Sequence, residues 1–136
     1  MIYTSYFQKQ VNKNDENTVY ASIAVGKPKT DFEFRLEDAY ILKPFGIFGK
    51  NLTDEEYKSL YLERLEKIGV EKIRRVLREI QGNKENLILL CFEKNREECH
   101  RSWFAEWWQE KTGEIIEEYE SEHKKTVKQL SIFDFV

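Results

Sequence analysis

The feature that most constrains the fold is the uninterrupted apolar run Leu87-Ile-Leu-Leu-Cys-Phe92 in the second half of the chain. An apolar run of this length between polar flanks is typical of a strand that is buried on both faces, as in the centre of a parallel sheet. The polar segment that follows it would then lie just past the carboxyl end of that strand. In open α/β sheets, ligands bind at that edge.

The rest of the chain predicts further strands and helices around this run. The β-branched and aromatic residues at 2–7 and 19–25 favour strands, and Thr53 with Glu56 forms a capping box that starts a helix. Helices are expected over residues 54–68, 70–80 and 99–111, and a further short strand is expected over 114–119. Residues 8–18 should form a loop. Residues 31–49 should form an irregular, aromatic-rich connection with a short helix or strand at 36–42. Strands separated by helices predict an α/β fold, a three-layer sandwich with a mostly parallel sheet flanked by helices.

The length and the charge of the chain limit the number of domains and the classes of function that it can have. The chain has 136 residues, of which 40% are hydrophobic, so we expect one α/β domain over residues 1–119, followed by a charged linker and an apolar motif over 120–136. The net charge of −3 argues against general binding to a nucleic-acid backbone. No membrane-spanning run and no secretory signal stand out, so we expect a cytoplasmic protein with reduced cysteines and no membrane association.

The polar segment after residue 92 holds both cysteines of the chain. Cys99 to Ser102 would form the first turn of a helix, where unpaired backbone N–H groups attract an anion and favour a thiolate. Arg101 could bind a phosphate or carboxylate there with two hydrogen bonds. The candidate catalytic residues are therefore Cys91, Glu93, Cys99 and His100, and the candidate ligand-binding residues are Arg101 and Ser102.

Structural interpretations of the same residues remain open. Cys91 is also a common kind of small buried residue, Arg101 could pair only with Glu93, and His100 could be a helix cap. Whether the protein is an enzyme stays undecided at this point.

More specific catalytic and metal sites agree less well with the spacing of these residues. A cysteine phosphatase or sulfurtransferase loop needs glycine, and residues 91–96 contain none. A zinc site could use Cys91, Cys99 and His100 with Glu93 or His123, but there is no Cys-x-x-Cys pair, so zinc is possible but not favoured and no cofactor is expected. Catalysis by Cys99 with His100 is disfavoured because neighbouring helical residues diverge by about 100°.

These motifs resemble the DUF488 family, a domain of unknown function. The resemblance is carried by an apolar strand that ends in Cys91-Phe-Glu93 and by Cys99-His100-Arg101, and the opening Ile2–Phe7 is similar to the short branch of that family. Leu42-Lys43-Pro44 resembles a further landmark. The resemblance implies a three-layer α/β fold in which Thr4 and Ser5 line one pocket with the cysteine and Cys-His-Arg motifs. It supplies no activity.

The tail suggests a partner. Gln129-Leu-Ser-Ile-Phe133 resembles the bacterial sliding-clamp binding pentapeptide, with Leu130 and Phe133 as apolar anchors, Ile132 as a conservative change, and Gln129 at the rim. Alternatively, these apolar residues pack back onto the domain. The leading hypothesis is a DUF488-like protein that binds an anionic ligand such as a nucleotide or a nucleic acid and is recruited to DNA replication or repair by this tail. A small-molecule enzyme with a structural tail and a non-catalytic adaptor are the alternatives.

Overall fold

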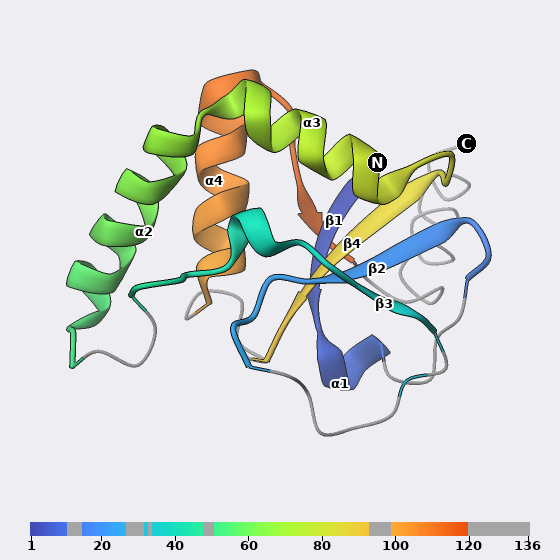
Figure 1. The fold of residues 1–136 in the computed structure, drawn as a ribbon, viewed down its shortest axis with the longest axis horizontal. Coiled ribbons are helices and arrows are strands. Elements are labelled where there is room, and N and C mark those ends of the chain that lie inside the picture. Colours follow the sequence, from blue (N-terminus) through green and yellow to red (C-terminus); the bar gives the residue numbers. More distant parts are fainter. Residues whose placement is uncertain (11–14, 27–31, 33, 48–50, 93–98, 120–136) are drawn as a thin grey trace, which may run out of the picture.

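In the computed structural model, the chain forms one sheet with helices packed against it (Figure 1). The structure describes residues 1–10, 15–26, 32, 34–47, 51–92 and 99–119. The strands are β1 (Ile2–Tyr6), β2 (Thr18–Ser22), β3 (Leu36–Asp38), β4 (Asn86–Cys91) and β5 (Glu117–Glu118); the helices are α1 (Phe7–Gln10), the 3₁₀ helix η1 (Tyr40–Leu42), α2 (Asp54–Ile68), α3 (Val70–Gln81) and α4 (His100–Thr112). The predicted α/β fold is confirmed.

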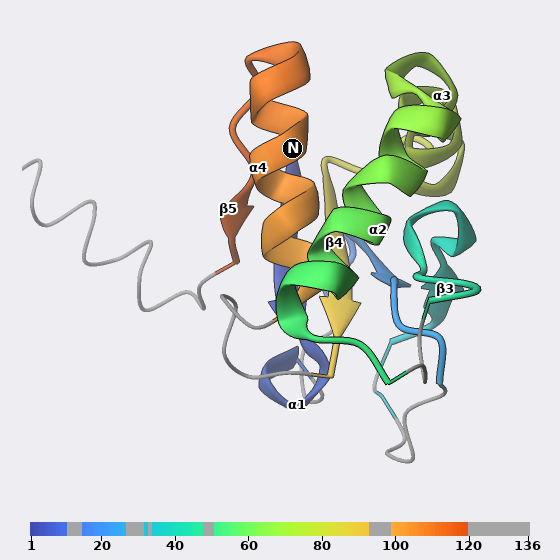
Figure 2. The same cartoon turned by 90° about the vertical axis from the view of Figure 1, so that its left-hand side faces the viewer.

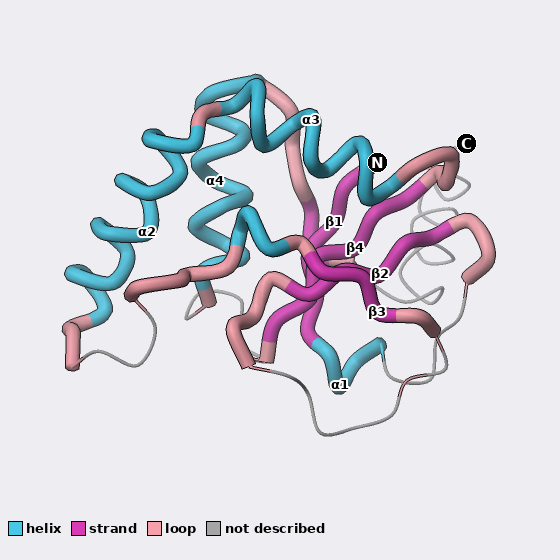
Figure 3. Tube along the Cα trace, viewed as in Figure 1, coloured by secondary structure: helices cyan, strands magenta, loops and turns pink. Residues whose placement is uncertain are grey.

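The apolar run forms the central strand of the sheet. The strand order is β3-β2-β4-β1-β5, and every neighbouring pair is parallel (Figure 3). Residues 87–91 are fully buried, as expected for a strand covered on both faces. Tyr6 pairs with Cys91, so the carboxyl ends of β1 and β4 lie side by side. This edge is where the sequence predicts the functional residues.

Alternation along β4 divides the core into two clusters. Leu87, Leu89 and Cys91 belong to the cluster formed with α2, α3 and α4, whereas Ile88 and Leu90 pack with aromatic residues that include Phe7 of α1. Figure 2 shows α2 and α4 running beside each other over the strands. The predicted capping box at the start of α2 is present. No helix in the described part of the chain is long and apolar enough to cross a bilayer.

Several predicted boundaries were wrong. The first strand ends at Tyr6, and Phe7 instead starts α1, because its ring packs into the second core cluster. The second strand ends at Ser22, where the Ser22 hydroxyl accepts the Ala24 backbone N–H at 3.2 Å and turns the chain. Residues 36–42 form both a strand and a helix, β3 and η1, and only two residues of 114–119 form β5.

Candidate functional site

The carboxyl end of β4 and the first turn of α4 bring four of the predicted site residues together. Cys91, Cys99, His100 and Arg101 are each at most 7% exposed. Cys91 ends β4, and Cys99 is the N-cap of α4. Residues 93–98, which include the candidate Glu93, lie outside the described residues. The site is therefore a buried cluster of sulfur, imidazole and guanidinium groups.

Arg101 is the centre of this cluster and is fully buried. Its Nε and Nη2 donate to the two carboxylate oxygens of Glu118 on β5 at 3.1 and 2.8 Å, and its Nη1 donates to the Cys91 sulfur at 2.8 Å. The guanidinium also lies 5.7 Å from the centre of the Tyr6 ring. A buried guanidinium requires a compensating charge, and Glu118 supplies it. Arg101 thus pairs with Glu118, a partner that the sequence did not indicate, whereas the predicted alternative partner Glu93 lies outside the described residues.

Thr4 and Ser5 lie on opposite faces of β1. The Thr4 hydroxyl donates to Glu118 Oε1 at 2.8 Å, so Thr4 joins the Arg101 cluster on the helical face of the sheet. Ser5 faces the other side, where its hydroxyl accepts from the Gln10 side chain at 3.1 Å. Because side chains alternate along a strand, neighbouring residues cannot both point to one pocket. The structure therefore brings Thr4, and not Ser5, to the cluster.

Cys91 and Cys99 face each other with their sulfurs in contact, so they form one cysteine pair and not two separate thiols. Their Cα atoms lie 7.5 Å apart, whereas bridged cysteines usually have Cα atoms about 4.4 to 6.8 Å apart. A bond between the sulfurs therefore depends on movement of the backbone around them. The fold holds the sulfurs in contact at the point where Arg101 reaches Cys91.

His100 is held as a neutral side chain. Its Nε2 lies 2.7 Å from the carbonyl oxygen of Ile23, which can only accept, so Nε2 carries the proton and Nδ1 does not. Burial lowers the pKa of His100 to about 4; the hydrogen bond to Ile23 opposes this shift, and the charge of Arg101 adds to it. The imidazole also packs edge-on against the Tyr61 ring, at 5.2 Å between ring centres.

The angular argument against contact between Cys99 and His100 was wrong. Cys99 is the N-cap, with φ −112° and ψ 145°, so it lies outside the helical part of α4. Its sulfur is 3.7 Å from the unprotonated Nδ1 of His100. The 100° divergence applies only between residues that are both helical. A reduced Cys99 therefore has a nitrogen acceptor next to its thiol.

Ser102 closes the first turn of α4 and reaches a neighbouring cleft. Its hydroxyl and its backbone N–H both bond the Cys99 carbonyl, at 3.0 and 3.1 Å. Ser102 and Glu118 also line a cleft of about 410 Å³ between α4 and β5. Glu106 and Glu117 contribute further carboxylates to that cleft. The cleft that borders Glu118 is consequently acidic.

Comparison with known protein families connects this site to a recognised sequence pattern. Residues 45–108 match the model of the family described as Domain of unknown function DUF488. This stretch, just under half of the chain, is similar to that family. It extends over α2, α3, β4 and most of α4, so it contains both Cys91 and the Cys99-His100-Arg101 motif. The resemblance inferred from these motifs is confirmed for that part of the chain.

The other comparisons add no relative. No curated protein and no solved structure showed significant similarity to the chain. The DUF488 match therefore supplies a family without a named activity.

Metal binding finds no support in the described part of the chain. No group of three or more His, Cys, Asp or Glu side chains there is placed to hold a metal ion. The zinc ligand sets considered from the sequence include Glu93 or His123, which lie outside the described residues. The predicted clamp-binding residues Gln129, Leu130, Ile132 and Phe133 also lie outside them.

Glu118 is the member of the Arg101 cluster that the sequence did not predict. Residues 114–119 were interpreted only as a strand, and nothing in the sequence of this segment singles out one of its acidic residues. The available signal was indirect: a buried arginine needs a carboxylate, and a strand beside Thr4 could supply one. The Tyr6 ring and the Ile23 carbonyl were missed for the same reason, since only the folded chain brings them to Arg101 and His100.

Proposed function

We propose that this protein binds a small anionic ligand, a nucleotide or a nucleic-acid-derived molecule, at the carboxyl edge of β1 and β4. The observation that supports the proposal is the paired hydrogen bonding between Arg101 and Glu118, at 3.1 and 2.8 Å. The Glu118 carboxylate accepts two hydrogen bonds from the guanidinium, in the same bidentate geometry that a ligand phosphate or carboxylate would adopt. An external anion therefore reaches Arg101 by taking the place of Glu118.

The position of Glu118 suits such an exchange. β5 has only two residues, lies at the edge of the sheet and pairs only with β1 among the described strands. The Glu118 side chain is 19% exposed and lines the cleft beside α4. Releasing it breaks a short strand pairing and leaves the central strands intact. The carboxylates around the cleft oppose anions in general, so a ligand has to compensate by bonding Arg101 and Thr4 directly.

A second candidate function is catalysis by Cys91. The Arg101 Nη1 lies 2.8 Å from the Cys91 sulfur, and a guanidinium in contact with a reduced cysteine favours the thiolate, which is the nucleophilic form. Cys99 would be the second thiol of the pair, and a ligand bound at Arg101 would lie beside both. In this reading Arg101 orients the ligand and stabilises the sulfur charge.

Titration calorimetry with nucleoside monophosphates tests the ligand proposal. Glu118→Gln weakens the internal competitor, so we expect it to bind several-fold more tightly than the wild type, and Arg101→Lys to bind more weakly because it loses the two-pronged contact. Glu110→Gln removes the same charge from an exposed position on α4 outside the cleft lining and is the matched control. Equal affinities in Glu118→Gln and Glu110→Gln would show that no anion competes with Glu118. The measurements are made at a temperature at which circular dichroism shows all variants folded.

We further propose that the tail recruits the protein to a DNA sliding clamp. The support is the sequence Gln129-Leu-Ser-Ile-Phe133 at the end of a charged segment. The full chain should bind a bacterial clamp in calorimetry, and the double variant Leu130→Ala with Phe133→Ala should lose that binding. Lys124→Ala with Lys125→Ala, in the charged segment before the motif, is the control. Clamp binding that survives the loss of both anchors would support instead a tail that completes the fold, as in the enzyme and adaptor alternatives.

A further inference from the structure

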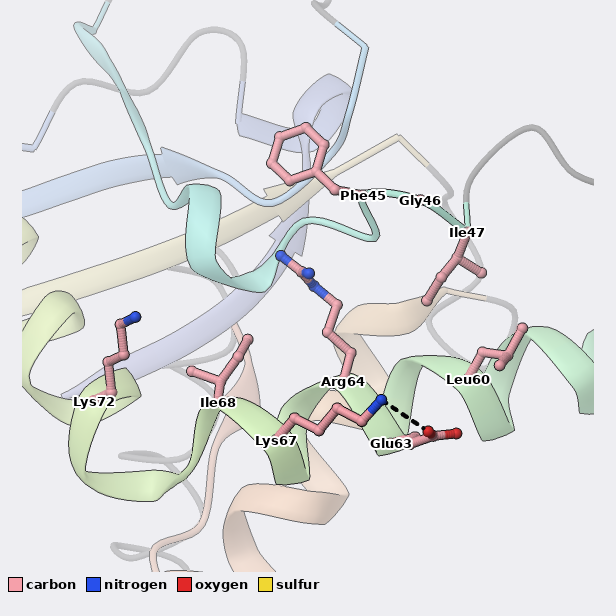
Figure 4. A pocket seen from close by; sticks show the side chains of 9 residues that line it. All are labelled: Phe45, Gly46, Ile47, Leu60, Glu63, Arg64, Lys67, Ile68 and Lys72. Atoms are coloured by element: carbon pink, nitrogen blue, oxygen red, sulfur yellow. Dashed lines mark ion pairs between the residues drawn. The ribbon is translucent and has the colours of Figure 1, made fainter.

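A second cleft lies between α2 and the segment after η1. It has a volume of about 440 Å³, and the start of α3 also contributes to it (Figure 4). Tyr61 and Leu65 of the same helix are fully buried in the core, and Tyr61 contacts His100. Among the described residues, none that lines this cleft belongs to the Arg101 cluster.

Arg64 is the central side chain of the cleft. It extends from α2 toward the segment that carries Phe45, and its guanidinium carbon lies 5.9 Å from the centre of the Phe45 ring (Figure 4). Its Nε is buried and has no hydrogen-bond partner in the described part of the chain. A buried N–H of a charged group without an acceptor is costly, and such groups usually have a ligand, water or ion as partner.

The other charges of the cleft are mostly positive. Lys67 and Lys72 line it with Arg64, and Glu63 is its only acidic lining residue among those described. These four side chains carry three positive charges and one negative charge, a net charge of +2 in a chain whose overall charge is −3. Glu63 is paired with Lys67 at 3.1 Å, so its charge is already compensated. The local positive charge of this cleft therefore attracts a small anion.

The apolar residues that line the cleft indicate that its ligand also carries a hydrophobic group. The Phe45 ring is 48% exposed and Leu60 is 40% exposed, and Ile47 and Ile68 extend the apolar surface between them. Gly46, next to Phe45, has φ +79° and no atom within 4 Å of where a Cβ would lie, so glycine is needed there for the turn and leaves the space open. A planar ring can pack on this surface beside the guanidinium.

We propose that this cleft binds an organic phosphate that carries a planar ring, of about the size of a mononucleotide. The phosphate pairs with the Arg64 guanidinium and approaches Lys72, and the ring packs on the apolar surface of Phe45 and Leu60. The cleft volume falls within the range of roughly 300 to 1,000 Å³ that is usual for small-molecule sites. The site is independent of the exchange proposed at Arg101, because the two sites share no residue among those described.

Calorimetry with adenosine 5′-monophosphate, adenosine and inorganic phosphate tests this proposal on the full chain. The monophosphate should bind more tightly than either part alone, since only it uses the ring surface and the charges together. Arg64→Gln should weaken its binding roughly tenfold or more, the usual effect of losing a charge-assisted hydrogen bond. Arg75→Gln removes the same charge from an exposed position on α3 outside the cleft lining, and should keep the wild-type affinity.

Further variants separate this site from the cysteine site and from a folding defect. Lys72 is exposed, so Lys72→Gln leaves the fold intact, and it should reduce affinity by a smaller factor than Arg64→Gln. Glu118→Gln changes binding at Arg101 and should leave the Arg64-dependent binding unchanged. Equal monophosphate affinity in Arg64→Gln and Arg75→Gln, or a monophosphate that binds no better than adenosine and phosphate, would overturn the proposal.

Discussion

Replacement of Glu118 by Gln probes the buried ion pair on which the cysteine site depends. The Glu118 carboxylate accepts three hydrogen bonds, one from Thr4 at 2.8 Å and two from Arg101 at 3.1 and 2.8 Å. Gln keeps one acceptor oxygen but turns a donor toward the fully buried guanidinium and removes the negative charge that pairs with it. This substitution should therefore destabilise the folded protein.

The size of the effect follows from the burial of the pair. Removing one partner of a buried ion pair costs about 3 to 5 kcal/mol. Because the Glu118 side chain is 19% exposed and Gln retains part of its bonding, we expect a loss of about 2 to 4 kcal/mol. In a domain of this size that lowers Tm by roughly 10 °C.

Urea denaturation at neutral pH measures this loss. The fluorescence of Trp103, Trp107 and Trp108 reports unfolding, because all three lie on α4 and are nearly buried. Glu117→Gln removes the same charge from the exposed face of the same strand and should stay within about 0.5 kcal/mol of the wild type. If Glu118→Gln unfolds at the same urea concentration as Glu117→Gln, the pair with Arg101 does not stabilise the fold and the reasoning fails.

Three further predictions concern the core around the site. The folded-state pKa of His100 is about 4, below its ordinary value of 6.5, so the unfolded state binds more protons between these two pH values. The free energy of unfolding should therefore fall by about 3 kcal/mol as the pH is lowered from 6.5 to 4. His100→Gln should flatten this part of a curve of Tm against pH. Oxidation with diamide should join Cys91 to Cys99, seen by mass spectrometry as a product that resists alkylation until dithiothreitol is added, and Cys99→Ser should abolish that product. Tyr61→Phe leaves the Leu42 carbonyl without its 2.7 Å hydrogen bond and should cost about 1 to 3 kcal/mol in urea denaturation, whereas an unchanged midpoint would mean that water replaces the hydroxyl.

The sequence predicted the fold class because its signals are local. The apolar run at 87–92 specifies a strand buried on both faces, and the capping box at Thr53 and the glycines after the helices specify where the helices begin and end. The family motifs were also recognisable because they are contiguous. Phe7 was misplaced because its aromatic character favours a strand, whereas its packing with the second core cluster decided its conformation.

The site was predicted only in part, for a physical reason. The sequence by itself determined that Cys91 ends a central strand, that Cys99, His100 and Arg101 open a helix, and that these groups therefore meet at the carboxyl edge of a parallel sheet. Only the tertiary structure decided their partners: Arg101 with Glu118, His100 with the Ile23 carbonyl, and the two cysteine sulfurs with each other. Those partners lie on elements distant in the chain, so their choice depends on strand order and register, which no local pattern encodes.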